Sequence, residues 1–353
     1  MTRDACIFIM AGGSGERFWP LSRTHTPKHL LRLLGERTLL EETVERVRGL
    51  VPEERIFVLT NRAQAEAAKN LLGFLPSENI IAEPVKRDTA PACALATAVT
   101  SRWGSKSVCA VLPADAMIHD VETFRSQLLA MLDAAERKDA ILTFGIPPTY
   151  PSTAFGYLEL SQPVSEASQD QPVDVIRFVE KPDAQTAKGY VVSGRFMWNA
   201  GIFSWRADWF LSEARRLEPV LAEFIENFPH TGDPTGFLES KFCTLPKISV
   251  DYAILEKTKR VIAIRAKFDW DDVGSWTALP AHLPQDADQN CTRGQVVLVE
   301  SKNNIVFSSG RVIALCGVND LVVVETNDAL LVCHRDAAQK IKQIQPMLPE
   351  ALR

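Results

Sequence analysis

The chain lacks any hydrophobic run approaching the roughly 20 residues that a membrane-spanning helix requires. It also lacks a run of basic residues, and its formal net charge of −5 argues against nucleic acid as the main partner. The first residues lead directly into an apolar run at 6–10, which leaves no room for a signal peptide. We therefore expect a cytoplasmic protein that binds neither membrane nor nucleic acid.

Paired cysteines are missing as well. The seven cysteines are an odd number, no Cys-x-x-Cys occurs, and several lie inside apolar runs. This pattern predicts buried, reduced thiols rather than a disulfide framework. His25 and His29 have the spacing that could place both on one metal ion, but no third ligand accompanies them, so we expect no zinc site there.

The remaining composition is that of an ordinary globular protein. Of 353 residues, 46% are hydrophobic and 24% are charged, which predicts one large domain and a smaller one. Strand-like and helix-like segments alternate in the first half of the chain: strands near 6–10, 55–60, 79–82, 107–112 and 140–144, and helices near 38–50, 62–72, 89–103 and 121–138. Such alternation predicts an α/β fold with a Rossmann-like, mostly parallel mixed sheet, in which ligands bind beyond the carboxyl ends of the strands.

The second half of the chain changes character. Residues 150–205 are rich in strand-like segments, and we interpret them as an insertion that forms a second wall over the site. Helices are expected near 206–228, 234–242 and 249–258, followed by a strand near 260–266 and a polar linker at 285–294. Five short strands and a helix near 336–345 then predict a small all-β module. We place the domain boundary between 1–285 and 286–353.

A glycine-rich turn follows the first apolar run. Gly12, Gly13 and Gly15 allow positive φ and close backbone approach to a ligand, and successive N–H groups in such a turn bind anions. With the cations Arg17 and Lys28 after it, the turn formed by Ala11, Gly12, Gly13, Ser14 and Gly15 is suited to a triphosphate. The turn lacks the third glycine of a dinucleotide-binding fingerprint, which argues against a nicotinamide-dependent dehydrogenase. It is not followed by Gly-Lys-Ser/Thr, so it is not a phosphate loop of the NTPase kind.

The combination of strand, glycine turn, Arg17, Pro20-Leu21 and Pro27-Lys28 resembles the signature of the sugar-nucleotidyltransferases, which join a sugar 1-phosphate to a nucleoside triphosphate. The continuation Phe-Trp-Pro-Leu-Ser-Arg at 18–23 resembles the mannose-1-phosphate guanylyltransferase branch. This resemblance implies the nucleotidyltransferase fold for the larger domain. For the C-terminal module it implies an abbreviated left-handed β-helix, although the sequence has no clean hexapeptide repeat.

Two aspartates are the candidate metal ligands. Asp115 follows a buried strand, and acids at 269, 271 and 272 precede a glycine turn. Mg²⁺ prefers a few carboxylate oxygens and leaves its other positions to water and phosphate. The resemblance implies that Asp115 and Asp272 hold Mg²⁺, while both could instead be loop-capping aspartates. Ala114 and Ala116 stand where the guanylyltransferases usually have Ser and His, which removes possible partners of Asp115.

The sugar side of the site rests on three motifs in the family's order. Glu180-Lys181-Pro182 follows a predicted strand and resembles the family's Glu-Lys-Pro element, and Gly156 and Asn199 lie in the two other motifs. The resemblance implies that Glu180 and Asn199 bind sugar hydroxyls, that Gly156 permits backbone approach, and that Lys181 meets the sugar phosphate. A surface ion pair before a turn proline is the alternative for the tripeptide.

The segment 83–92 precedes an alanine-rich helix and resembles the stretch that borders the purine in guanylyltransferases. The resemblance implies nucleotide-binding roles for Glu83, Arg87, Asp88 and Thr89, although the family has Asn at the position of Asp88. A purely structural interpretation also exists, because Asp88 or Thr89 would make a natural N-cap with Pro91 in the first turn.

The implied reaction is attack of the phosphate oxygen of mannose 1-phosphate on the α-phosphorus of GTP, which gives GDP-mannose and pyrophosphate. Arg17 and Lys28 would be the catalytic cations, and no general base is needed because the attacking phosphate is already ionised. Alternatives are another nucleotide, another sugar 1-phosphate such as a heptose 1-phosphate, or a catalytically silent regulatory subunit, against which the retained charged residues argue. The sequence ends at Arg353, so we expect a single activity; a homodimer is left open.

Overall fold

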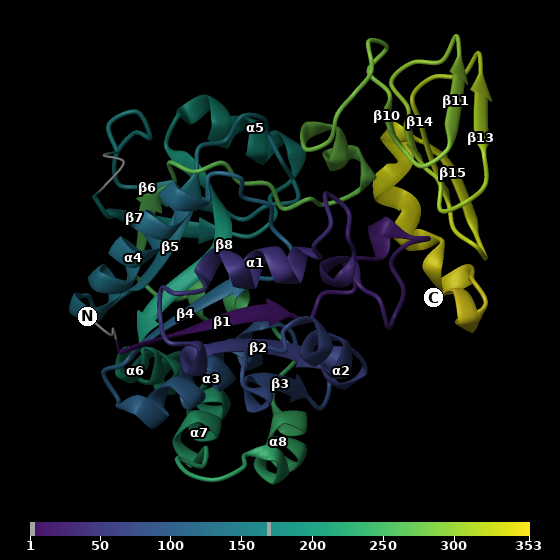
Figure 1. Ribbon diagram of the computed structural model, residues 1–353. Coiled ribbons are helices and arrows are strands. Elements are labelled where there is room, and N and C mark those ends of the chain that lie inside the picture. The colour runs from purple at the N-terminus through teal and green to yellow at the C-terminus, as the bar shows by residue number, and fades with distance from the viewer. Residues whose placement is uncertain (1–3, 168–170) are drawn as a thin grey trace. The chain divides into compact units, whose positions relative to one another are not determined.

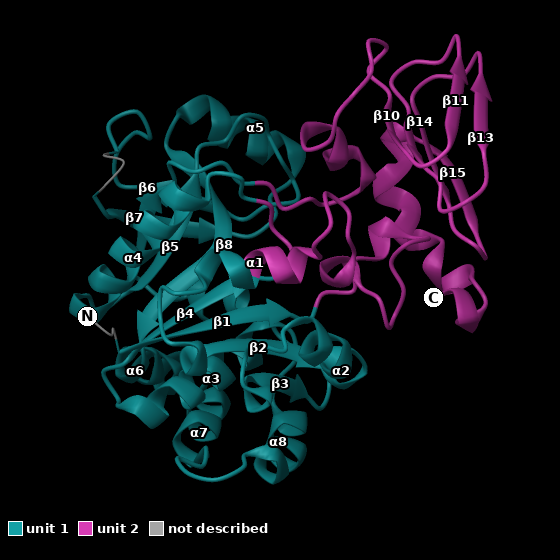
Figure 2. Cartoon of the chain, in the orientation of Figure 1, with its two compact units in different colours: residues 1–12, 44–114, 118–270 teal, residues 13–43, 115–117, 271–353 magenta. Residues whose placement is uncertain are grey.

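The computed structural model describes residues 4–167 and 171–353 (Figure 1). Residues 1–3, on which the expected absence of a signal peptide partly depends, lie outside the described residues. The chain divides into two compact units, one of residues 1–12, 44–114 and 118–270 and the other of residues 13–43, 115–117 and 271–353 (Figure 2). Among the helices of the described residues, none combines the length and apolar character needed to cross a membrane.

A nine-stranded mixed sheet forms the centre of the first unit, in the order β3-β2-β1-β4-β8-β5-β9-β7-β6. Its strands are β1 (Ala5–Ala11), β2 (Ile56–Asn61), β3 (Ile80–Glu83), β4 (Val108–Pro113), β5 (Ile141–Ile146), β6 (Tyr157–Leu160), β7 (Val173–Val179), β8 (Phe196–Arg206) and β9 (Val261–Arg265). The first four in the sheet order run parallel, whereas β8 is antiparallel to both of its neighbours β4 and β5.

Parallel pairing brings two functional segments to one edge of this sheet. The register joins Met10 of β1 to Pro113 of β4, so the two strands end together. The glycine turn continues from β1, and Asp115 lies two residues beyond the end of β4. The prediction that both segments start at the carboxyl edge of a mostly parallel sheet is therefore confirmed.

Helices cover the sheet because its central strands are apolar on both faces. They are α1 (Leu39–Val47), α2 (Arg62–Leu71), α3 (Thr89–Thr100), α4 (Val121–Arg137), α5 (Ala184–Ser193), α6 (Ala207–Leu217), α7 (Pro219–Asn227) and α8 (Thr235–Lys241). Alternate side chains of β1 point to opposite faces, and Cys6 and Phe8 join a core cluster with α3, whose residues from Ala90 to Thr100 are all buried. A helix buried on all sides explains the run of alanines there.

Three expectations for the first unit need correction. Residues 150–205 form no separate wall, since β6, β7 and β8 continue the main sheet and β8 lies between β4 and β5. The single helix expected at 206–228 is two helices, because Pro219 starts α7 at a position where its missing N–H costs nothing. Helix α5 was not predicted, although Asp183 caps its first turn and Gly194 ends it at φ +65°.

The second unit contains a small all-β module, as predicted. Its strands are β10 (Cys291–Arg293), β11 (Val296–Val299), β12 (Ile305–Phe307), β13 (Ile313–Cys316), β14 (Leu321–Glu325) and β15 (Leu330–His334). Strands β10, β12 and β14 stack in parallel, as do β11 and β13, so that successive turns of chain lie on one another in a β-helix-like arrangement. The helix expected near 336–345 is a 3₁₀ helix at Arg335–Gln343.

The polar segment 285–294 is not simply a linker, because β10 lies within it. The side chain of Asn290 is buried, and its amide oxygen accepts hydrogen bonds from the backbone and side-chain nitrogens of Asn304, each at 3.0 Å. Polar side chains that look solvated in the sequence here join one turn of the module to the next. An unpaired amide would be costly in the same place, which explains why both asparagines are buried together.

Candidate functional site

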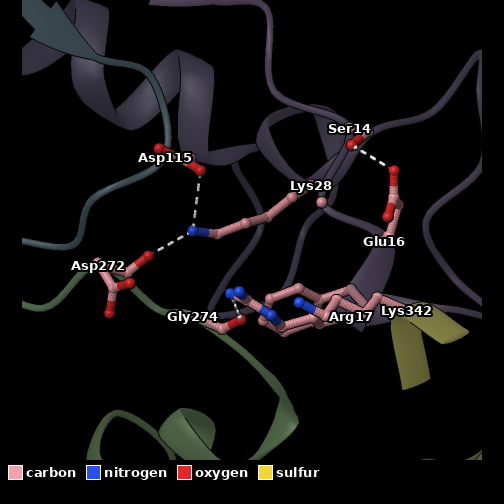
Figure 3. Close-up of a pocket in the computed structure, with 10 residues that line it drawn as sticks. Ser14, Glu16, Arg17, Lys28, Asp115, Asp272, Gly274 and Lys342 are labelled. Carbon is pink, nitrogen blue, oxygen red and sulfur yellow. Dashed lines mark hydrogen bonds and ion pairs between the residues drawn. The ribbon is translucent and has the colours of Figure 1, made fainter. Parts of the chain in front are cut away.

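A cavity of about 340 Å³ lies within the second unit (Figure 3). Six of the residues around it were predicted as site residues: Ser14, Gly15, Arg17, Lys28, Asp115 and Asp272. Four others were not predicted: Glu16, Phe18, Gly274 and Lys342. Segments that are far apart in the sequence thus contribute cations, carboxylates and a glycine turn to one small space.

The glycine at position 15 is required by close packing against Lys28. Its φ is +62°, in the left-handed region that favours glycine, and a Cβ placed there would lie 2.2 Å from the Cβ of Lys28. The turn therefore does more than expose N–H groups. It also leaves room for the 3₁₀ helix Lys28–Leu30, which carries the lysine into the cavity.

Lys28 lies between the two predicted metal ligands. Its Nζ is 3.0 Å from Oδ2 of Asp115 and also donates to the backbone carbonyl of Asp272 (Figure 3). The lysine side chain is only 7% exposed, whereas that of Asp115 is 39% exposed. A cation that has lost most of its water but keeps two oxygen partners is held in a fixed position, as stabilisation of developing negative charge requires.

The three acids at 269, 271 and 272 have different tasks. Asp269 accepts hydrogen bonds from the backbone nitrogens of His119 and Asp120. Asp271 is partly buried, which raises its pKa, but its bonds with His282 and the backbone nitrogen of Val273 lower the pKa overall. The carboxylates of Asp269 and Asp271 thus hold neighbouring loops in place. Of the three acids, only Asp272 lines the cavity.

The side chain of Asp272 is half-buried at the cavity. Burial raises its pKa to about 6, although Lys28 lowers it in part. Within residues 4–167 and 171–353, this carboxylate accepts no hydrogen bond. A buried acceptor of this kind gains most from a cation, and two carboxylates with room for water and phosphate match the ligands that Mg²⁺ prefers. Asp115 and Asp272 therefore fit a divalent cation.

Other metal arrangements find no support. In the part of the chain that the structure describes, no group of three or more His, Cys, Asp or Glu side chains could hold a metal ion. His25 is exposed, whereas His29 is buried, and burial lowers the pKa of His29 to about 4.

The predicted sugar residues lie in the first unit, around the end of β7. The ammonium of Lys181 contacts the carboxylate of Glu180, and Lys181 has the unusual φ of +46°. A Cβ at Gly156 would lie 2.6 Å from Oε2 of Glu180, so only glycine leaves that carboxylate in place. Asn199 uses its amide oxygen to accept from Thr143, at 2.9 Å, and from the backbone of Gly201.

Sequence reasoning missed Asp251, which interacts electrostatically with both Glu180 and Lys181. Burial, together with the neighbouring Glu180 carboxylate, raises the pKa of Asp251 to about 6. The residue begins the π-helix Asp251–Leu255, which lies within the helix expected near 249–258. Two carboxylates around one ammonium form a cluster that can bind both hydroxyl groups and a phosphate.

In the segment predicted to border the purine, three of the four predicted residues make contacts within the protein, and the fourth is a buried acid. Asp88 caps α3 by accepting from the backbone of Thr89, as its structural interpretation predicts, and the Thr89 hydroxyl accepts from the backbone of Val250 at 2.8 Å. Arg87 donates to the carbonyl of Cys243. Glu83, at the end of β3, is 9% exposed, and burial alone raises its pKa to about 8.

The raised pKa of Glu83 predicts how stability depends on pH. The folded state binds this proton more tightly than the unfolded state, whose pKa is near 4.5, so charging Glu83 costs stability as pH rises from about 4.5 to about 8. We expect Glu83→Gln to raise the free energy of unfolding by up to about 5 kcal/mol above pH 8, with the gain vanishing below pH 4.5. Urea unfolding across this pH range measures the difference.

The exposed Glu54 provides a matched control on the 3₁₀ helix Glu53–Arg55. Its glutamine variant is expected to change the free energy of unfolding by less than about 0.5 kcal/mol at any of these pH values. Equal behaviour of the two variants would show that Glu83 carries no burial cost.

Comparison with known proteins identifies families for most of the chain. Residues 7–289 match the model of the nucleotidyl transferase family, and residues 294–348 match that of the MannoseP isomerase/GMP-like beta-helix domain. The second match covers the strands β11 to β15, which include the parallel stacked pairs β11–β13 and β12–β14. It bears out the β-helix-like architecture expected for the C-terminal module.

Individual relatives agree with the family models. The chain is 38% identical to the xanthan biosynthesis protein XanB of Xanthomonas campestris pv. campestris, over 99% of this chain and 74% of that one. It is 37% identical to a mannose-1-phosphate guanylyltransferase of Escherichia coli, over 97% of this chain and 73% of that one. The crystal structure of the mannose-1-phosphate geranyltransferase from Thermus thermophilus matches with a TM-score of 0.86 and 35% identity, over 98% of this chain and 99% of that one.

Proposed function

This chain belongs to the nucleotidyl transferase family, and we propose that it transfers GMP from GTP to mannose 1-phosphate, giving GDP-mannose and pyrophosphate. The observation that carries the proposal is the position of Lys28, flanked by Asp115 and Asp272 in the cavity that also holds Arg17 and the glycine turn. The choice of GTP and mannose 1-phosphate is supported by the relative named mannose-1-phosphate guanylyltransferase.

In the proposed reaction, a phosphate oxygen of mannose 1-phosphate forms a bond to the α-phosphorus of GTP. The bond from that phosphorus to the oxygen that bridges the α- and β-phosphates breaks, and pyrophosphate leaves with the electron pair. No proton has to be removed from the nucleophile, because the sugar phosphate is ionised at neutral pH. Two polyanions must meet, so alignment and charge neutralisation are the main tasks of the protein.

The cavity residues suit those tasks. Of the turn at 11–15, Ser14 and Gly15 line the cavity together with Arg17. We assign the N–H groups of the turn and the guanidinium of Arg17 to the triphosphate, since a guanidinium can donate to two phosphate oxygens at once. Lys28 places a fixed positive charge at the α-phosphate, where negative charge builds as the new bond forms. Mg²⁺ held by Asp115 and Asp272 would supply further positive charge to the phosphate oxygens.

The sugar 1-phosphate is assigned to the cluster in the first unit. Lys181 binds its phosphate, while Glu180 and Asn199 bind hydroxyl groups. Within the described residues, the side-chain nitrogen of Asn199 has no acceptor, so it is available to a ligand. Gly156 is needed because a larger residue would displace Glu180.

The base of GTP is assigned to the segment after β3. Glu83 offers a buried acceptor there, and Arg87, Asp88 and Thr89 fix the backbone around it. We propose a domain boundary between residues 285 and 286. A cytoplasmic location is supported by the buried free thiols Cys6, Cys93 and Cys109.

A substrate panel tests the proposal. Pyrophosphate release is measured for four nucleoside triphosphates against mannose, glucose and heptose 1-phosphates, with and without Mg²⁺. We expect kcat/KM for GTP with mannose 1-phosphate to exceed every other pair by about 100-fold, because loss of matched buried hydrogen bonds is costly. Equal turnover of dTTP with glucose 1-phosphate would refute the assignment of substrates.

A further inference from the structure

Lys342 enters the phosphate cavity from the C-terminal module (Figure 3). It belongs to the 3₁₀ helix Arg335–Gln343, which contacts the 3₁₀ helix Glu16–Phe18 that carries Arg17. In the sequence, Arg17 and Lys342 lie 325 positions apart, so that no motif joins them. The cavity thus receives a cation from the module that follows the nucleotidyl transferase region.

The helix that carries Lys342 is firmly packed. Ala338 and Ile341 on its inner face are buried in a core cluster that includes Phe18 and Trp276. At its start, the ring of His334 accepts from the backbone of Asp336, which satisfies one of the otherwise unpaired N–H groups. Anchored on that face, the helix holds the base of Lys342 at the cavity.

Lys342 differs from the other cations of the cavity in its contacts. Lys28 contacts Asp115 and the carbonyl of Asp272, and Arg17 donates to the carbonyl of Gly274 at 3.2 Å. In the described parts of the chain, Lys342 makes neither a hydrogen bond nor an ion pair. Because Lys342 is exposed, its ammonium can turn toward an anion in the cavity, where its charge and that of the Arg17 guanidinium would act together.

We propose that Lys342 binds the β- and γ-phosphates of GTP and then the pyrophosphate that leaves. The inference rests on the proposed function and extends it, because it makes the β-helix-like module a direct contributor to the substrate site. Lys28 is assigned to the α-phosphate and Lys181 to the sugar phosphate, so the tail of the triphosphate is the remaining anion for Arg17 and Lys342. Removing the module would then weaken GTP binding even in a catalytic domain that stayed folded.

The test compares Lys342→Met with Lys340→Met in the full chain. Both lysines are exposed and lie on the same 3₁₀ helix, but Lys340 does not line the cavity. For Lys342→Met we expect KM for GTP, and KM for pyrophosphate in the reverse reaction, to rise about tenfold or more, as for the loss of one charge-assisted contact. KM for mannose 1-phosphate should change less than about twofold, and Lys342→Arg should recover most of the loss.

A second measurement separates this inference from the assignment of the sugar. Calorimetric titration of inorganic pyrophosphate with Mg²⁺ reports the phosphate site without any sugar, and we expect weaker binding only for Lys342→Met. If the protein binds pyrophosphate but does not turn over mannose 1-phosphate, the proposed substrate is refuted. The comparison of Lys342→Met with Lys340→Met then still tests the role of Lys342. Equal affinity in Lys342→Met, Lys340→Met and the unsubstituted protein, or no pyrophosphate binding by any of them, would overturn the role of Lys342.

Discussion

Replacing Lys28 by Met is expected to lower kcat for GDP-mannose formation by about 10³-fold, the effect of losing a preorganised charge at the reacting phosphate. The side chain is nearly buried and already oriented by Asp115 and by the carbonyl of Asp272, so no water molecule or mobile lysine can take its place. Because the charge acts mainly in the transition state, kcat and kcat/KM should fall together. Steady-state kinetics with saturating Mg²⁺ measures both.

Two controls distinguish loss of the Lys28 charge from misfolding of the variant. The thermal unfolding temperature of Lys28→Met should stay within a few degrees of that of the unsubstituted protein, because methionine fills a similar volume. Lys106→Met removes an exposed lysine of the first unit and should leave kcat unchanged. A Lys28→Met protein that is folded and keeps more than a third of the activity would exclude Lys28 as a catalytic cation.

Gly15→Ala is expected to reduce kcat by about 100-fold, because the added methyl group would displace Lys28 from its position in the cavity. The new Cβ would meet the Cβ and the backbone of Lys28, and the residue would have to keep a φ of +62°. The left-handed conformation and the overpacking together should cost about 2 kcal/mol or more of stability. Activity assays and urea unfolding of the same preparation test both effects.

Gly35→Ala is the matched control. Gly35 lies in the same unit and is exposed, and no heavy atom lies within 4 Å of where its Cβ would be. This variant should keep full activity and unfold at the same urea concentration. If Gly15→Ala behaves like Gly35→Ala, then the glycine is not required for the position of Lys28, and the turn serves only to bind phosphate through its N–H groups.

Local patterns in the sequence were sufficient for the parts of the fold that depend on nearby residues. The apolar run of β1 and the glycines after it predict a strand and an anion-binding turn, because each feature needs only a few adjacent residues. The end of β4 and Asp115 follow from the same reasoning, and the parallel pairing of β1 with β4 confirms it. The glycine at 15 was assigned to ligand approach, whereas the structure adds packing against Lys28.

Contacts between distant segments could not be predicted. Nothing in the sequence pairs Lys28 with Asp115, 87 residues away, and the sequence does not show which of the acids at 269, 271 and 272 is left without a donor. Lys342 looks like one of several exposed lysines until its helix packs against the segment of Arg17. The strand β10 was missed because the polar segment 285–294, which contains it and the buried Asn290, has the composition of a linker.

Buried acids are a recurring cost in this molecule. Burial raises the pKa of Glu83, Asp251 and Asp272 above the usual range of carboxyl groups, and each lies in a segment to which we assign a substrate or a metal ion. Such costs persist where a ligand supplies the missing partner. Binding of GTP, sugar phosphate and Mg²⁺ should therefore raise the unfolding temperature, by an amount that grows with ligand concentration above Kd.

The fate of the three phosphates of GTP tests the central claim most directly. The protein is incubated with mannose 1-phosphate, Mg²⁺ and GTP labelled in either the α- or the γ-phosphate, and the products are separated by chromatography. We predict that the α-label appears in GDP-mannose and that the γ-label appears in pyrophosphate, in equal amounts. Transfer of the γ-label to the sugar, or its release as orthophosphate without any GDP-mannose, would contradict nucleotidyl transfer by this chain.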